Sequence, residues 1–196
     1  MDVAMDLSST TLETDRLILR PWRAEDLSDL YAYASEPGVG EMAGWPHHTS
    51  MEISQKILDS FIAEKEVFAV VLQETGHVVG SLGLHGSWAN GDPPYGHLAQ
   101  KEIGYVLSKE QWGKGLMTEA VRAVIRFAFD SLGLDAVSIG HFTANDRSRR
   151  VIEKCGFTYV REGTFFSRQM DRQLEDRKYI LVNPARCKTG MDAPSV

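Results

Sequence analysis

A glycine-containing loop at residues 112–118 (WGKGLMT) has the composition of an anion-binding site. A predicted strand precedes the loop and a helical pattern follows it, so its backbone N–H groups would lie at the positive end of a helix dipole and could bind phosphate. It contains neither G-x-x-x-x-G-K-[ST] nor G-x-G-x-x-G, which excludes a Walker A loop and a dinucleotide fingerprint. The alternative is that Gly113 and Gly115 serve only a tight turn.

A second polar stretch occupies residues 145–157 (NDRSRRVIEKCGF). It places Asn145 at the end of a predicted strand and Ser148 one turn into a predicted helix, which Gly156 and Phe157 close. Both stretches therefore lie where a strand gives way to a helix.

A sheet and several helices must position these two stretches. Apolar alternation and β-branched runs predict strands at 14–21, 67–72, 78–84, 101–107, 136–142, 157–160 and 178–182. Apolar residues at helical spacing predict helices at 25–34, 51–64, 118–132 and 146–154. This order predicts a mixed α/β (α+β) sheet whose leading strands are antiparallel, with one right-handed β-α-β crossover near the middle.

The chain length of 196 residues is typical of one domain, which we expect to cover residues 12–183. Residues 1–11 and 184–196 are expected to be flexible termini, because the apolar periodicity is lost in the tail.

The composition narrows the environment and the partners. The net charge of -6 has no basic stripe, which disfavours nucleic acid and suits a cationic substrate. No apolar run is long enough to span a membrane and no signal peptide is evident, so we expect a cytoplasmic protein without a membrane partner. Cys155 and Cys187 are expected to be free thiols, and the histidines lack metal-ligand spacing, so no metal is predicted. A monomer or a homodimer is expected.

Taken together, these segments resemble the GNAT superfamily of N-acetyltransferases, in particular the branch with the ribosomal-protein-alanine N-acetyltransferases. The motifs that carry the resemblance are T-x-R-L-x-L-R at 14–20, E-I-G-Y at 102–105, W-G-K-G-x-x-T-E-A at 112–120 and N-x-x-S-x-x-x-x-E-K-x-G-F at 145–157. The resemblance covers roughly residues 12–183. It implies the GNAT fold, in which a mostly antiparallel sheet of about seven strands is splayed in the middle and flanked by about four helices.

The resemblance also implies acetyl-coenzyme A as the cosubstrate and assigns its binding residues. The pyrophosphate would be wrapped by a continuous backbone segment made of Trp112, Gly113, Lys114, Gly115, Leu116, Met117 and Thr118. The pantetheine arm would run between two splayed strands beside Val106, Leu107 and Asn145, which brings the coenzyme sulfur near Ser148.

Acetylation requires a neutral amine, because an ammonium has no lone pair. By the resemblance, Glu102 lies in the strand beneath the acetyl group, where it could accept the amine proton directly or through water. The alternative is a Glu102 that only pairs with a neighbouring strand or is solvated. A backbone N–H of the Val106–Leu107 region would stabilise the developing oxyanion.

The leaving thiolate would gain from a proton. Many GNAT enzymes supply it from a tyrosine seven residues after the asparagine, but Ile152 occupies that position here. Ser148 is the remaining candidate, and its alternative role is to cap the helix.

The expected reaction is acetyl transfer to a primary amine, first of all the N-terminal α-amino group of a ribosomal protein or other peptide. A self-protection enzyme for a polyamine, aminoglycoside or peptide antibiotic is a second possibility, and a non-catalytic acyl-coenzyme A sensor is a third. The acceptor would be chosen by the loops at 35–50, 87–97 and 161–176. Candidate contacts in these loops are His47, His48, Trp45, Trp88, Tyr95, Phe165 and Phe166.

Overall fold

Side-chain alternation in the first long strands requires helices on both faces of the sheet. In β2 (Leu17–Pro21), Leu17 and Leu19 are fully buried in one hydrophobic cluster, while Ile18 packs against another. In β3 (Val67–Leu72), Phe68 and Val70 belong to the first cluster, and the second cluster contains Val67, Ala69 and Val71. Because each strand is apolar on both faces, neither face can be left to solvent.

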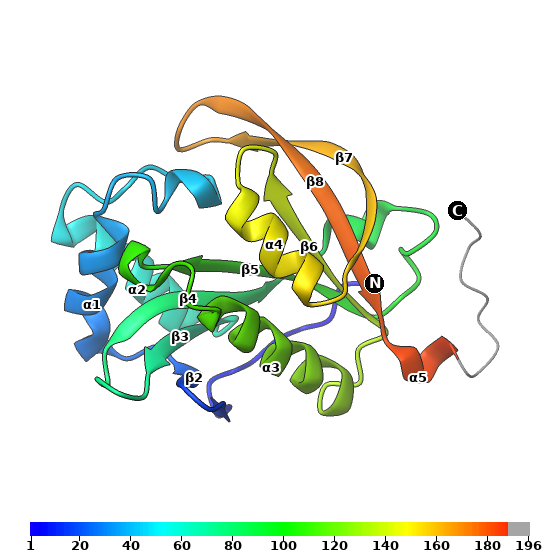
Figure 1. Cartoon of the computed structure of the whole chain (residues 1–196), viewed down its shortest axis with the longest axis horizontal. Helices are drawn as coiled ribbons and strands as arrows, with labels where there is room; N and C mark the ends of the chain where they lie inside the picture. Colours follow the sequence, from blue (N-terminus) through cyan, green and yellow to red (C-terminus); the bar gives the residue numbers. More distant parts are fainter. Residues whose placement is uncertain (188–196) are drawn as a thin grey trace.

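The computed structural model describes residues 1–187, which contain an eight-stranded sheet of order β1-β2-β3-β4-β5-β6-β8-β7 (Figure 1). The remaining strands are β1 (Leu12–Glu13), β4 (Val78–His85), β5 (Gln100–Leu107), β6 (Ala136–Phe142), β7 (Thr158–Ser167) and β8 (Arg172–Val182). Adjacent strands are antiparallel except β5 and β6, which are parallel and joined through a helix.

Helices cover the two faces separately (Figure 1). The helix bounds are α1 (Leu27–Ala34), α2 (Met51–Glu64), α3 (Leu116–Asp130), α4 (Asp146–Lys154) and α5 (Pro184–Cys187), with short 3-10 turns η1 (Ala24–Asp26), η2 (Glu41–Ala43), η3 (Trp88–Gly91) and η4 (Lys109–Gln111). Residues of α1 and α2 contribute to one cluster, and residues of α3 and α4 to the other. The predicted α/β sheet is confirmed.

The sheet opens between its two parallel strands. Pairing of β5 with β6 ends at Ile103 and Ile139, although β5 continues to Leu107 and β6 to Phe142. Beyond these residues the two strands diverge, so the main-chain groups of β5 that face β6 have no strand partner. The predicted splay in the middle of the sheet is therefore present.

Several predicted elements need correction. The eighth strand, absent from the predicted set, is the two-residue β1. Strands β7 and β8 are much longer than the predicted 157–160 and 178–182, and most of the predicted 161–176 loop belongs to their hairpin. The hairpin escapes sequence prediction because both faces of β7 are largely exposed, so main-chain pairing forms it without apolar alternation.

The first eleven residues, expected to be flexible, lie against the sheet in the structure. Leu7 is 1% exposed and its N–H donates to the Lys65 carbonyl at 2.8 Å. The Asp2 carboxylate is 3.3 Å from the ammonium of Lys101, a buried lysine that also pairs with Glu66. Burial of Leu7 and the charge of Lys101 explain this packing. Of the expected C-terminal tail, residues 184–187 form α5 and 188–196 lie outside the described residues.

No helix within residues 1–187 is long and apolar enough to cross a membrane.

Candidate active site

One cavity lies beside the glycine loop, between the end of β5 and helix α4. We call it the loop cavity; its volume is about 300 Å³. The predicted cofactor residues that line it are Val106, Leu107, Trp112, Gly113, Gly115, Leu116, Met117, Thr118, Asn145 and Ser148. Lys114 is the one predicted residue outside the lining, because its ammonium turns back to the Gln111 side chain at 3.0 Å.

The loop backbone leaves room for a ligand. Gly113 and Gly115 adopt positive φ angles of 77° and 80°, a conformation that side chains rarely tolerate. A Cβ on Gly113 would meet no atom within 4 Å, so the space beside it is open. Gly115 caps α3 without a side-chain hydrogen bond, and the first N–H groups of that helix have no partner within it. This arrangement fits a pyrophosphate.

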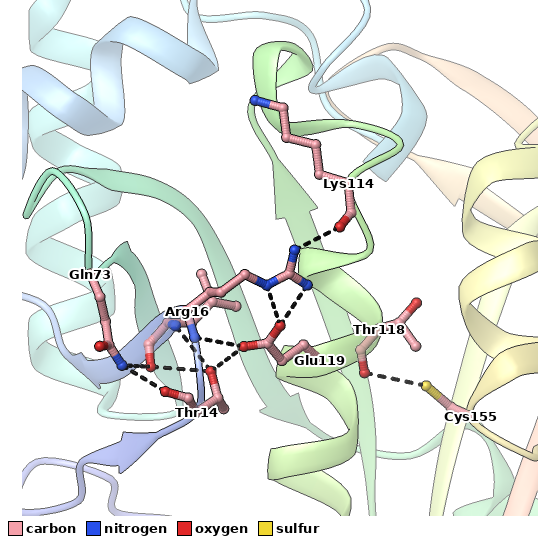
Figure 2. Close-up of polar contacts among 8 residues, drawn as sticks. Thr14, Arg16, Gln73, Lys114, Thr118, Glu119 and Cys155 are labelled. Atoms are coloured by element: carbon pink, nitrogen blue, oxygen red, sulfur yellow. Dashed lines mark hydrogen bonds and ion pairs between the residues drawn. The ribbon is translucent and has the colours of Figure 1, made fainter.

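The turn between β1 and β2 holds this loop in place (Figure 2). The Glu119 carboxylate accepts hydrogen bonds from the Thr14 hydroxyl at 2.6 Å and from Arg16 Nε at 2.8 Å. Arg16 also donates to the Lys114 carbonyl at 3.0 Å, and Gln73 donates to the Thr14 carbonyl at 2.7 Å. Burial raises the pKa of Glu119, but the hydrogen bonds from Thr14 and Arg16 outweigh burial and lower it overall. The network ties the β1–β2 turn to the start of α3.

Sequence reasoning missed a basic wall of the loop cavity. Arg147, Arg150 and Lys154 line it from α4, and the Arg147 guanidinium lies 4.4 Å from the centre of the Trp112 ring. Their i, i+3 and i+7 spacing places them on one helix face, a signal that was present in the sequence. Three cations suit the phosphates of coenzyme A.

A second cavity of about 620 Å³, here called the sheet cavity, opens over the splayed strands. The residues that line both cavities are Met42, Ala43, Tyr105, Val106, Asn145 and Ser148. The two cavities therefore meet where β5 and β6 separate.

Glu102 lies in the sheet cavity, not in the loop cavity. Its carboxylate accepts a hydrogen bond from the Trp88 backbone N–H at 3.1 Å. Burial raises the pKa of Glu102, with nearby Asp176 acting in the same direction and Lys178 opposing. A carboxyl with a raised pKa is a better proton acceptor at neutral pH.

Ser148 contacts a residue that sequence reasoning did not select. Its hydroxyl is 2.8 Å from the hydroxyl of Tyr105, which also lies within both cavities' linings. Burial raises the pKa of Tyr105, so the phenol keeps its proton. The side chain that caps α4 is Asn145, whose oxygen accepts from the Ser148 N–H at 3.1 Å. The E-I-G-Y motif contained the signal for Tyr105, but only the fold brings it to α4.

The other candidates separate into two groups. Trp45, Trp88 and Phe165 line the sheet cavity, whereas His47, His48, Tyr95 and Phe166 line neither cavity. The imidazole of His48 is buried and lies 2.7 Å from the Ser54 hydroxyl.

Cys155 is a free thiol, as expected, with its sulfur 3.8 Å from the Thr118 carbonyl oxygen (Figure 2). Burial raises the pKa of this thiol to about 11, which disfavours it as a nucleophile. No group of three or more His, Cys, Asp or Glu that could hold a metal occurs in the described part of the chain.

Comparison with known proteins agrees with this geometry. Residues 16–158 match the acetyltransferase (GNAT) domain model. The chain is 30% identical over 184 residues to the uncharacterized N-acetyltransferase YoaA of Bacillus subtilis (strain 168), covering 88% of this chain and 97% of that protein. It is 26% identical over 165 residues to an aminoglycoside N(6')-acetyltransferase type 1 of Klebsiella pneumoniae, covering 80% of each.

The fold is also similar to that of the ribosomal-protein-S5-alanine acetyltransferase from Vibrio fischeri, with a TM-score of 0.67 at 19% identity over 90% of this chain and 98% of that one. Since the domain model spans most of the chain and a relative matches it over nearly its full length, the chain belongs to the GNAT family of acetyl-coenzyme A-dependent N-acetyltransferases.

Proposed function

We propose that the protein transfers an acetyl group directly to a primary amine, with the donor in the loop cavity and the acceptor in the sheet cavity. The observation that carries this proposal is the junction of the two cavities at Tyr105, Val106 and Ser148, with Glu102 inside the acceptor side. A donor and an acceptor placed on either side of that junction can react without a covalent enzyme intermediate.

On the donor side, the N–H groups at residues 113–118 would hold the pyrophosphate, and Arg147, Arg150 and Lys154 would neutralise the phosphates. Bound acetyl-coenzyme A supplies a thioester that an amine can attack. The unpaired edge of β5 beyond Ile103 offers main-chain hydrogen bonds to an extended arm.

Glu102 would accept the proton that the acceptor ammonium must lose before it can attack. The Trp88 N–H fixes the carboxylate orientation and burial raises its pKa, which favour proton transfer near neutral pH. The length of β5 between Glu102 and Val106 favours a water as the carrier of that proton.

Ser148 and Tyr105 would deliver a proton to the leaving thiolate. Their hydroxyls share a short hydrogen bond, and the raised pKa of Tyr105 keeps a proton available in the pair. The thiol of coenzyme A has a pKa of about 8.5, so proton donation to the leaving thiolate would accelerate the reaction only modestly.

Two acceptor classes have support. The motif resemblance to the ribosomal-protein-alanine branch supports a protein or peptide N-terminus. The likeness to an aminoglycoside acetyltransferase and the carboxylates in the sheet cavity support a small molecule with amino groups.

A panel assay tests the proposal. Release of coenzyme A thiol is measured with acetyl-coenzyme A and three acceptor groups: alanine- and serine-ended peptide amides, linear polyamines and aminoglycosides. We expect amine-dependent thiol release and a stoichiometric N-acetyl product identified by mass spectrometry. If acetyl-coenzyme A binds but no amine in any group is acetylated, the proposed reaction is wrong.

A further inference from the structure

Three glycines on neighbouring strands line the sheet cavity. Gly83 on β4 is paired with Gly104 on β5, and both line the cavity together with Gly140 on β6. The His85 ring occupies the space beside Gly83 and Gly104, because a Cβ at the first position would clash with its Nε2 and a Cβ at the second would lie 3.2 Å from its Cδ2. Gly140 lies beside the charged groups of the cavity, because a Cβ there would be 3.7 Å from the Lys178 side chain and 3.8 Å from Glu102 Oε1.

One carboxylate that lines the sheet cavity has an unsatisfied oxygen. Asp176 lines the cavity and is 4% exposed. Its Oδ2 is 2.7 Å from the Lys178 ammonium, but its Oδ1 has no hydrogen-bond partner among residues 1–187. A buried oxygen left unpaired is unfavourable, so a donor brought by a ligand would be favourable there.

The paired strand is shaped to leave this oxygen in place. Gly163 of β7 is opposite Asp176, and a Cβ at Gly163 would lie only 2.6 Å from Oδ1. A larger residue would displace the carboxylate.

Within the described lining, no basic side chain remains free to bind an acceptor carboxylate. Lys178 is already paired with Asp176. Both ring nitrogens of His141 are engaged, by the Phe142 carbonyl at 2.8 Å and the Tyr179 hydroxyl at 3.1 Å. Desolvation lowers the pKa of His85, so this imidazole is neutral at pH 7. With Glu102 and Asp176 in the same cavity, free amino acids are disfavoured.

Aromatic walls favour a cation further. Trp88 already holds the Arg161 guanidinium 5.2 Å from its ring centre, and the Phe142 and Phe165 rings are 5.7 Å apart beside Asp176's strand. Trp45 lines the same cavity. Rings of this kind attract ammonium groups and tolerate the aliphatic carbons between them.

We propose that the acceptor is a small di- or polyamine without a carboxylate, in which one amino group faces Glu102 and a second donates an N–H to Asp176 Oδ1. This inference rests on the proposed acetyl transfer and names its substrate class. Asp176 is then a specificity-determining residue.

Matched acceptors test the second amino group. We would measure kcat/KM for 1,4-diaminobutane, n-butylamine, 4-aminobutanoate and an alanine-ended tripeptide amide at pH 8. A charged hydrogen bond predicts a preference of about 10- to 100-fold for the diamine over butylamine. Equal rates for these two amines, or a faster reaction of the peptide or the carboxylate than of the diamine, would overturn the assignment.

Matched variants test the residue. Asp176→Asn should bring the diamine to butylamine ratio close to one, because the second contact is lost. Asp176 also helps to raise the pKa of Glu102, but the effect of losing that influence falls on both amines and cancels in the ratio. Glu175→Gln, which alters the adjacent exposed carboxylate of β8, should keep the wild-type ratio. An equal loss on both amines in Asp176→Asn would make Asp176 structural and contradict the proposal.

Two further measurements keep the outcome decisive. Should Asp176→Asn fold poorly, Asp176→Asn/Lys178→Gln removes the ion pair as a whole and should lose the same preference. Calorimetric titration of 1,4-diaminobutane into the protein saturated with coenzyme A should show weaker binding to Asp176→Asn and to the double variant than to wild type. Wild-type acetylation of butylamine without diamine preference refutes this inference alone, whereas no acetylation of any amine refutes the proposed function and this inference with it.

Discussion

At the scale of single residues, the candidate site separates proton acceptance from proton donation. Glu102 lies on the acceptor side with its pKa raised by burial, and the Ser148–Tyr105 pair lies at the junction of the cavities. The two groups lie on different elements and contact different parts of the reacting molecules. Each can therefore be removed without removing the other.

Glu102→Gln should lower kcat/KM by about 10²-fold, the usual size of a lost general base. Glutamine keeps the acceptor for the Trp88 N–H, so acetyl-coenzyme A should bind with unchanged affinity. The deficit should shrink at high pH, where the amine is already neutral. Steady-state kinetics across the pH range check this prediction. A wild-type rate at every pH would show that bulk water, and not Glu102, accepts the proton of the acceptor ammonium.

Ser148→Ala and Tyr105→Phe should each lower kcat by about 3- to 10-fold, because a thiolate can leave unaided. Their hydroxyls form one hydrogen bond, so the double variant should be no slower than the worse single one. The Kd of acetyl-coenzyme A should stay within 2-fold or so. Multiplicative losses in the double variant would show that the two hydroxyls act independently.

At the scale of elements, the loop between β5 and α3 depends on contacts from the distant β1–β2 turn. Thr14 and Arg16 hold Glu119 on α3, and Arg16 also holds the Lys114 carbonyl (Figure 2). The T-x-R opening of the chain therefore positions the glycine loop. Helix α4 faces the same cavity with its basic side.

Gly115→Glu should abolish acetyl-coenzyme A binding. The substitution forces a side chain onto a φ of 80° and places a negative charge where the pyrophosphate would lie. Gly76→Glu is the matched control, since Gly76 has a φ of 74° in the β3–β4 turn and open space around it. Calorimetry should show loss of binding in the first variant only. If Gly115→Glu binds acetyl-coenzyme A with normal affinity, the loop is not part of the binding site.

At the scale of the whole molecule, burial in the sheet favours the protonated form of the Glu102 carboxyl group. The pKa of Glu102 is raised in the fold, so its ionisation above this pKa opposes folding. The contribution of Glu102 to the free energy of unfolding is therefore most favourable below its pKa in the unfolded state, about 4.3. This contribution declines as the pH rises through the raised pKa of the folded state.

Glu102→Gln removes that decline, so the variant should have a higher free energy of unfolding than wild type at pH 7. The advantage should vanish below pH 4 or so, where Glu102 is protonated in both states. Denaturant unfolding of both proteins at the two pH values measures the difference. A variant less stable than wild type at pH 7 would show that ionised Glu102 stabilises the fold.

Local patterns in the sequence determined most elements and the glycine loop. The predicted bounds of α2, β3, β6 and α4 agree with the structure, because their apolar residues are spaced for one buried face or a buried run. The loop at 112–118 was equally visible, since glycine at positive φ before a helix is a local property. These features need no information about distant residues.

Only the tertiary structure decided which side chains meet. The approach of Tyr105 to Ser148 joins a strand to a helix 43 residues away, and no local spacing predicts it. The long β7–β8 hairpin is stabilised by main-chain pairing with little apolar alternation, so the predicted loop at 161–176 was mostly strand and brought Asp176 to the sheet cavity. Long-range pairing sets register, and register determines which carboxylates, glycines and rings share one face.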